Sequence, residues 1–236
     1  MTAKFHHPDV GEISVKVLST ARNISARWKS ADRVQLTVPA YATRKDVERA
    51  LVELMPRLLM RRPQKKFYTP GWRFETPEMI FEVVAGVKPG RFEGVVDRVG
   101  KRITLMMPPD IPQTGTEEFN EWVRKAIDSY ARRYAGQILV PMARQIAVKL
   151  GVRPADIGIS YGQRVLGRCN SRGEILLSRN LVFYPVELRE MVIAHEFAHL
   201  THLNHSVRFK QLLNNYLGGR LPELNRRFRA FKLPFL

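Results

Sequence analysis

The stretch MVIAHEFAHLTHLNHSVRF, residues 191–209, decides how the rest of the chain is interpreted. The chain has six histidines, and four of them lie in this stretch, at His195, His199, His202 and His205. In the pattern His-Glu-x-x-His, His195 and His199 are four residues apart, so an α-helix would stack both imidazoles on one face. Both rings could then reach one metal ion, with Glu196 near enough to hold a water on that ion without being a ligand.

A third ligand is expected from the same stretch, because a catalytic zinc ion usually takes three protein ligands and leaves its fourth position to water. His205 fits if the helix ends shortly after Leu203, since Asn204 can adopt the left-handed conformation that turns the chain back. His202 is the alternative, but a straight helix carries it one turn beyond His199. The predicted metal ligands are therefore His195, His199 and His205.

Glu196 is the predicted catalytic residue. Zinc lowers the pKa of its bound water from ~15.7 toward ~7, and Glu196 would accept the proton and pass it to the leaving amine. A metal site that only stabilises the fold would leave Glu196 without a role. The sequence leaves open which side chain would polarise the scissile group opposite the metal, and the candidates are Arg168, Tyr184, Arg208 and Tyr216.

Composition indicates a folded protein, because 236 residues with 44% hydrophobic side chains can bury a sizeable core. The one cysteine, Cys169, excludes an internal disulfide framework and a cysteine-rich zinc site, and it is typical of a reducing compartment. The N-terminus lacks the apolar segment of a secretory signal, and no apolar run approaches the ~18 residues of a membrane helix. The expected location is therefore the cytoplasm, without membrane attachment.

The net charge of +17 is unevenly distributed. Residues 57–73 contain six Lys or Arg and no acid, and residues 206–236 contain seven against Glu223. Such a bias favours nucleic acids, nucleotides or acidic surfaces as partners. It is equally typical of a solvated basic surface that keeps a protein in solution.

The first part of the chain is predicted to be rich in strands. Residues 12–18 and 34–38 alternate apolar and polar side chains, with residues 21–28 expected to continue the first strand. A helix is expected from Thr43, whose side chain can cap it, and Pro56 should kink it or end it early. The basic, turn-rich segment 61–71 is a candidate linker.

Further strands are expected near Phe74 and over residues 79–84, 92–96 and 102–107. The segment 108–116, PPDIPQTGT, carries three prolines and a glycine and is the strongest predicted boundary. The predicted domains are therefore residues 1–112, a β-rich region with one helix, and residues 113–236.

The second part is predicted to be mainly helical. A long helix is expected over residues 117–150, capped by Thr116 and ended by Gly151, with a kink at Pro141. Strands are expected at residues 157–161 and 174–178, joined by a turn segment. Helices are then expected over residues 185–203, 206–217 and 222–231.

These residues resemble those of the YgjP-like metallopeptidase-domain family. The matching segments are GEILL at residues 173–177, Pro185, VIAHEFAHL at 192–200, NHS at 204–206, and Phe209. The family's HExxH-x5-H pattern maps onto His195, Glu196, His199 and His205. Where the family typically has Trp-Gly-Ser-Cys, this chain has Leu166-Gly167-Arg168-Cys169, and Ser178 replaces a usual asparagine.

The resemblance implies an α+β protein, with the β-rich N-terminal half followed by a zincin-like helical metal-dependent hydrolase half that contains a short sheet. In such folds the strand before the active helix is an edge that pairs with an extended peptide, so residues 175–178 are expected at an edge. The expected cofactor is Zn²⁺, with another divalent metal as the alternative.

Three functions remain open at this point. The leading one is a zinc-dependent metallopeptidase that acts on a peptide substrate. The second is a metal-dependent hydrolase of nucleotide phosphoanhydrides, in which basic residues would hold the phosphates. The third is a nucleic-acid-associated protease similar in logic to the SprT-like proteases, bound through the basic surface.

Overall fold

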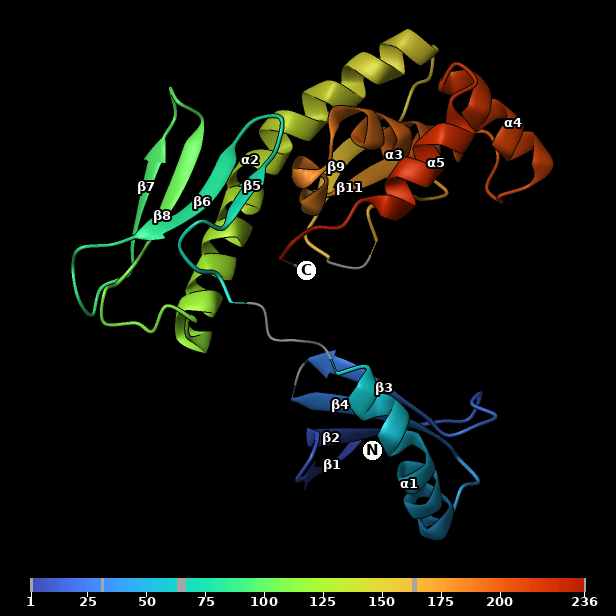
Figure 1. The fold of residues 1–236 in the computed structure, drawn as a ribbon. Helices are drawn as coiled ribbons and strands as arrows, with labels where there is room; N and C mark the ends of the chain where they lie inside the picture. Colours follow the sequence, from blue (N-terminus) through green and yellow to red (C-terminus); the bar gives the residue numbers. More distant parts are fainter. Residues whose placement is uncertain (1, 31, 63–66, 163–164, 236) are drawn as a thin grey trace. The chain divides into compact units, whose positions relative to one another are not determined.

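The computed structural model describes residues 2–30, 32–62, 67–162 and 165–235. Helices and small sheets alternate along the chain, which confirms the expected α+β class. The internal contacts divide the chain into two compact units, Met1–Lys66 and Phe67–Leu236 (Figure 1). This division falls in the predicted basic linker, whereas the predicted domain boundary at residues 112 and 113 lies within the second unit.

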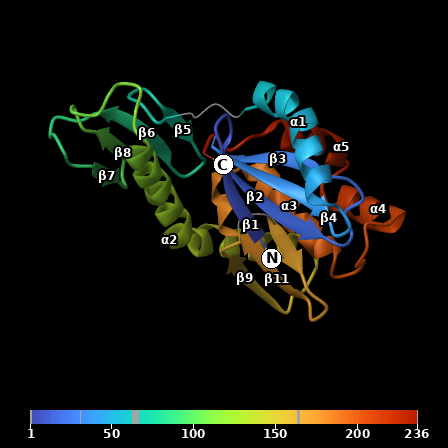
Figure 2. The same ribbon diagram turned by 90° about the horizontal axis from the view of Figure 1, so that it is seen from below.

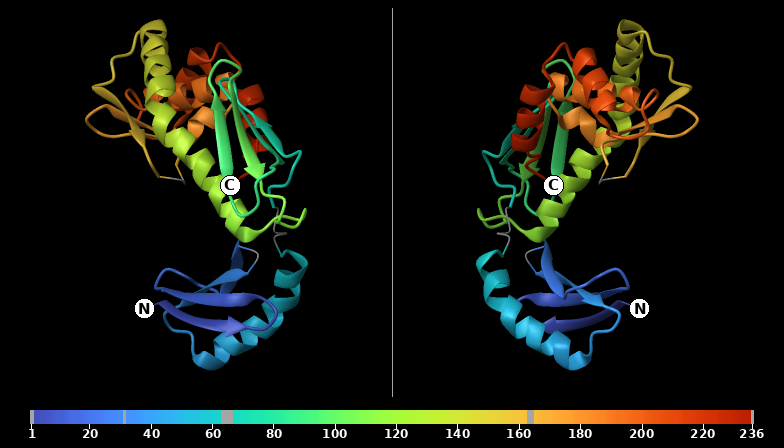
Figure 3. Two further views of the ribbon diagram at one scale, coloured as in Figure 1. Left: turned by 90° about the vertical axis from the view of Figure 1, so that its left-hand side faces the viewer. Right: turned by 90° about the vertical axis from the view of Figure 1, so that its right-hand side faces the viewer.

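The first unit is a four-stranded sheet with one helix packed on it (Figure 3). Its elements are β1 (Thr2–His7), β2 (Gly11–Leu18), β3 (Ser25–Ser30), β4 (Arg33–Pro39) and α1 (Arg44–Met60). The strand order is β1-β2-β4-β3, with β2 parallel to β4. The sequence interpretation missed β1 and was wrong about residues 21–28, because β3 pairs with β4 as a separate strand.

Helix α1 begins as predicted and does not end early at Pro56. Thr43 and Asp46 form a reciprocal capping box at its start. The helix continues through Pro56 to Met60, although proline removes one amide donor. The apolar side of the helix packs in the core of the unit through Leu58 and its neighbours, while Val52, four residues before the proline, is 76% exposed. The helix tolerates Pro56 because its apolar side is buried in the core, while its opposite side, which includes Val52, is accessible to water.

The second unit contains two sheets that share one long helix. The first sheet consists of β5 (Arg73–Glu75), β6 (Ile80–Ala85), β7 (Glu93–Asp97) and β8 (Arg102–Met107), in the order β5-β6-β8-β7. The second consists of β9 (Asp156–Ser160), β10 (Gly167–Cys169) and β11 (Glu174–Ser178), in the order β10-β11-β9. Helix α2 (Glu117–Leu150) lies between the two sheets in both Figures 1 and 2.

One hydrophobic core explains why the predicted boundary at 112 and 113 does not separate compact units. The same buried cluster contains Phe81 and Leu105 of the first sheet, Val123 of α2, and Ile175 of the second sheet. The proline-rich segment 108–116 is therefore a connection inside this unit, because the strands before it and the helix after it bury the same surface.

Helix α2 has the predicted ends. The Thr116 side chain accepts a hydrogen bond from the Phe119 amide, and Gly151 takes a left-handed conformation with φ of 67°. The helix runs through Pro141. From its middle to its end the helix is buried through alanines and one leucine, at Ala131, Ala135, Leu139, Ala143 and Ala147. These short side chains allow β9 and the following elements to approach closely.

The remaining elements are η1 (Arg179–Phe183), α3 (Val186–Ala198), α4 (Val207–Tyr216) and α5 (Leu221–Ala230). Helix α3 ends at Ala198, before the predicted limit at residue 203. Among the residues that the structure describes, no helix has the length and apolar character needed to span a membrane.

Arg189 of α3 ties this helix to the first sheet of the unit. Its guanidinium is 1% exposed and donates two hydrogen bonds of 2.6 Å to the carboxylate of Glu78, which precedes β6. It also donates to the carbonyls of Tyr184 and Val182, both at 2.7 Å. A buried cation is stable only when its donors are paired in this way, so Arg189 depends on Glu78.

We expect Glu78→Gln to lower the free energy of unfolding by about 3 kcal/mol, because the substitution leaves the buried Arg189 without its counter-ion. Urea denaturation followed by circular dichroism measures the change. The control is Glu75→Gln, which breaks the exposed pair with Arg73 and should cost about 1 kcal/mol or less. Equal losses in the two variants would contradict the structural role of the buried pair.

Candidate metal centre

Three of the histidines singled out in the sequence converge at the end of α3. His195 lies in the last turn of the helix, His199 follows its last residue, and His205 precedes Ser206, which caps α4. The Nε2 atom of His195 lies 3.2 Å from Nε2 of His199 and 3.1 Å from Nε2 of His205. The ligand atoms of all three residues lie within 4.8 Å of one another.

The three imidazoles fit a divalent metal in donor type and in spacing. Zinc binds histidine nitrogen at about 2.0–2.1 Å, so two nitrogens at tetrahedral positions are about 3.3 Å apart. The observed separations are close to this value. Nδ1 of His199 lies 3.0 Å from the carbonyl oxygen of His202, which places the ring proton on Nδ1 and leaves the Nε2 lone pair for an ion.

His202 contributes its backbone and not its ring to this cluster, which agrees with the preference for His205. The turn that separates the two residues differs from the one expected. Lys101 is the non-glycine residue with positive φ in the described part of the chain, so Asn204 is not left-handed. Short turns close the helix instead, with hydrogen bonds from the His199 amide to Glu196 O and from the His202 amide to Ala198 O.

The Phe209 ring packs against all three imidazole rings. It is 2% exposed, and its ring centroid lies 4.9 Å from that of His195, 4.6 Å from His199 and 4.9 Å from His205. Its amide donates to the Ser206 hydroxyl, so the first turn of α4 sets its position. Sequence reasoning placed Phe209 only within the matching segments and gave it no role. The available signal in the sequence was an aromatic residue three positions after the helix-capping Ser206.

Burial shifts the pKa values of two groups at the site. Burial, followed by the nearby His199 and His205, lowers the pKa of His195 to about 4, so this imidazole is uncharged at neutral pH. Burial raises the pKa of Glu196 to about 7, and a hydrogen bond from the Cys169 backbone opposes that shift. Burial, and then the Glu196 charge, raises the pKa of the Cys169 thiol. Glu196 therefore lies in an enclosed environment against β10.

The edge of the second sheet next to α3 is β10 and not the predicted residues 175–178. Residues 175–178 belong to β11, which lies between β10 and β9 and is not an edge strand. β10 forms the edge on the side of α3, antiparallel to β11, with Arg168 opposite Leu176. The interpretation failed because a three-residue strand inside a segment rich in glycine and arginine has no alternation to detect.

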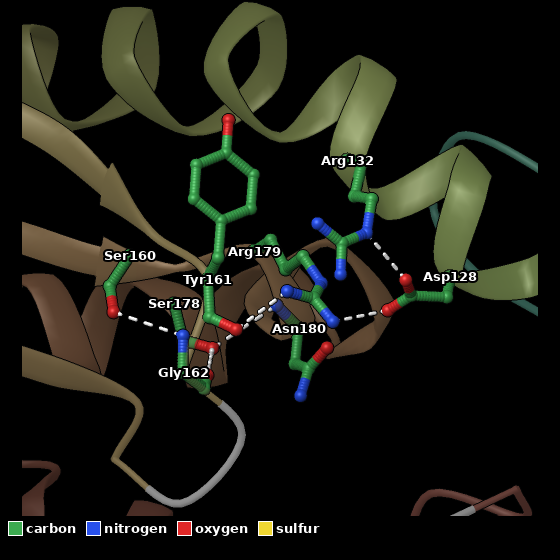
Figure 4. Close-up of polar contacts among 8 residues, drawn as sticks. All are labelled: Asp128, Arg132, Ser160, Tyr161, Gly162, Ser178, Arg179 and Asn180. Atoms are coloured by element: carbon green, nitrogen blue, oxygen red, sulfur yellow. Dashed lines mark hydrogen bonds and ion pairs between the residues drawn. The ribbon is translucent and has the colours of Figure 1, made fainter.

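A buried arginine holds the residues that directly follow β9 (Figure 4). Arg179 is 2% exposed and donates to the Tyr161 carbonyl at 2.6 Å and to the Asp128 carboxylate of α2. The Ser178 hydroxyl donates to the Gly162 carbonyl at 3.4 Å. These bonds join α2, η1 and the end of β9, so the residues that follow β9 are fixed on both sides.

The candidates for a polarising side chain lie in different environments. The Tyr216 hydroxyl forms a hydrogen bond with Thr201, in the turn between His199 and His205. Tyr184 packs between aromatic rings of α5 and its end, at Phe228 and Phe231. Arg168 and Arg208 are exposed.

Two crystal structures are similar to part of this chain. One is the metallopeptidase zymogen jannalysin of Methanocaldococcus jannaschii, with 20% identity over 38% of this chain and 92% of that chain, and a TM-score of 0.34. The other is the metallopeptidase zymogen abylysin of Pyrococcus abyssi, with 19% identity over 39% of this chain and 93% of that chain, and a TM-score of 0.35. Among curated proteins, none matches the chain.

One family model matches most of the sequence. It describes a YgjP-like metallopeptidase domain and covers residues 22–229, which includes the three histidines, Glu196 and most of the first unit. Metal-dependent hydrolysis is the activity of that domain type, and the family implies a divalent metal and a peptide substrate. The chain therefore belongs to the YgjP-like metallopeptidase-domain family and is a metal-dependent hydrolase.

Proposed function

We propose that this protein is a zinc-dependent peptidase whose metal is held by His195, His199 and His205 and whose general base is Glu196. The observation that carries the proposal is the convergence of three Nε2 atoms, two pairs of which are 3.1 and 3.2 Å apart. A nitrogen-only donor set of this spacing suits zinc, although other divalent transition metals accept the same ligands.

The residues around the cluster have separate tasks in this proposal. When bound, the ion would supply Lewis-acid chemistry that activates water and polarises the scissile carbonyl. The His202 carbonyl and the Phe209 ring hold the ligand imidazoles in orientation. Glu196 takes the proton from the attacking water at its carboxylate and delivers it to the leaving amine.

The substrate would lie along β10. Because β11 is paired on both sides, β10 is the outer strand next to Glu196, and the Gly167 backbone would offer its main-chain groups to a peptide while the Cys169 backbone bonds the carboxylate. An extended peptide that adds to this edge gains main-chain hydrogen bonds, as in other cases of β-augmentation. Such binding reads the peptide backbone and places few demands on side chains.

The net charge of +17 favours a second candidate, the hydrolysis of nucleotide phosphoanhydrides at the same centre. Basic residues would then hold the phosphates. The same charge would also suit a peptidase that acts on proteins bound to nucleic acid, for which binding should weaken steeply with salt. An assay with peptides and nucleoside triphosphates separates the second candidate from a peptidase, and the salt dependence of nucleic-acid binding tests the third.

We expect His205→Ala to lose bound metal, because it removes one of three ligands, whereas His202→Ala should retain it. Purified variants would be dialysed against zinc and buffer, and their metal content measured by inductively coupled plasma mass spectrometry. The wild type should bind about one equivalent. Loss of metal in the His202 variant together with retention in the His205 variant would reverse the ligand assignment.

We expect Glu196→Gln to keep its metal and to lower kcat by at least about 10²-fold, because the amide cannot accept the water proton. Glu190→Gln, on the same helix, is the matched control and should keep full activity. Casein-derived peptides and nucleoside triphosphates are assayed in parallel, each with and without a chelator. Chelator-sensitive turnover of triphosphates alone would replace the peptidase proposal with the second candidate.

A further inference from the structure

Gly167 of β10 lies directly against the carboxylate of Glu196. A Cβ atom placed on Gly167 would be 2.4 Å from Oε1 of Glu196, 2.6 Å from its Cγ and 2.7 Å from its Cδ. Non-bonded contacts of a real Cβ stay beyond 3.0 Å. All three of the nearest atoms belong to one side chain, so an alanine at this position would displace Glu196 or the strand.

Backbone conformation does not explain this glycine. Gly167 is absent from the glycines with positive φ, and it pairs with Leu177 in a regular antiparallel register. Gly173, at the turn before β11, has φ of 77° and needs glycine for that reason. The space that the missing side chain leaves for Glu196 is therefore the reason for glycine at position 167.

Glu196 has little freedom to move away from β10. It lies in the last turn of α3 and is 6% exposed, and its neighbours Phe197 and Ala198 are fully buried. The backbone of Cys169, two residues after Gly167, forms a hydrogen bond with the carboxylate. The carboxylate is thus held between the helix that carries it and the strand that it touches.

The strand orientation places the backbone contact from Cys169 on the outer edge of β10, while residues 167 and 169 share one face of the strand. The Ser178 amide donates to the Leu166 carbonyl at 2.8 Å, and the Asn170 amide donates to the Glu174 carbonyl at 3.1 Å. Residues 166 and 170 therefore face β11, and the alternating residues 167 and 169 direct their backbone groups away from it.

We propose that Gly167 is a positioning residue that fixes the carboxylate of Glu196 beside the edge strand. This inference rests on the proposed function of Glu196 as the base. β10 (Gly167–Cys169) would then orient both the base and the main chain of a peptide that adds to this strand. A side chain at position 167 would push the carboxylate from the point where it meets the attacking water.

The test is a double-mutant cycle between Gly167→Ala and Glu196→Ala, measured by thermal unfolding of the full chain. Gly167→Ala should lower Tm by about 5 °C when Glu196 is present, because the added methyl group overpacks the site. In the Glu196→Ala background the same change should shift Tm by less than about 1 °C. A single variant that fails to fold while the double variant folds would equally support the contact.

The matched control is Gly158→Ala in β9, where the added Cβ would meet only the flexible Leu176 side chain, at 3.1 Å. Its effect on Tm should be the same in both backgrounds, and its activity should match that of the wild type. A loss of Tm from Gly167→Ala that is equal with and without Glu196 would overturn the inference.

Activity measurements distinguish a positioning role of Gly167 from a purely structural one, which would leave kcat unchanged. Below its Tm, Gly167→Ala should keep one equivalent of zinc and a KM within about 2-fold of the wild type, while kcat falls at least about 10-fold. Unchanged kcat would overturn the positioning role. If the wild type cleaves no peptide, the proposed function fails, whereas the cycle still decides whether Gly167 holds Glu196.

Discussion

The position of α3 depends on the buried guanidinium of Arg189. A cation in the protein interior is costly unless every donor is paired, and here Glu78 and two carbonyls pair it. Glu78 lies in the turn between β5 and β6, and the two carbonyls belong to the segment before α3. The helix that carries His195 and Glu196 is therefore fixed at its start by charge and along its length by apolar burial. A second buried cation, Arg179, is paired with the Asp128 carboxylate and the Tyr161 carbonyl, while its Nε has no hydrogen-bond partner among the described residues.

Protein contacts also restrain the histidine cluster. Two residues of the cluster, His199 and His205, lie outside regular helix, where loops usually have more freedom. The His202 carbonyl and the capped first turn of α4 restrict that freedom, and the Phe209 ring packs against all three imidazoles. Contacts with the His202 carbonyl and the Phe209 ring thus restrain the imidazoles that would hold the ion.

Most of the fold could be predicted where one physical signal dominates a long segment. Helix α2 followed from its cap at Thr116, its stop at Gly151 and its apolar stripe, and the pairing of His195 with His199 followed from their spacing on a helix. The errors lie where short-range and long-range forces compete. Pro56 favours a helix end, but tertiary burial around Leu58 keeps the helix intact. The segment 108–116 has the composition of a boundary, yet the core on both sides of it is shared.

The parts of the site that could not be predicted are those made by contacts distant in sequence. Arg189 and Glu78 are 111 residues apart, and neither carries a local signal of pairing. β10 is too short for a strand pattern, and it is defined only by its partner β11. The histidine pattern therefore indicates which atoms can bind a metal, but not which strand lies beside the base.

One short strand, β10, meets two requirements of the site that the histidine motif does not indicate. Glu196 is buried, so its carboxylate loses most of its hydration and needs a substitute partner to stay ordered. A backbone N–H is the smallest donor available, and it can approach closely only if the strand lacks a side chain at the point of contact. Glycine at position 167 meets that condition. The same three-residue strand also has backbone groups at Gly167 that face away from β11, beside the same carboxylate. The requirement to hold a buried base and the requirement to offer a free edge thus select the same short strand.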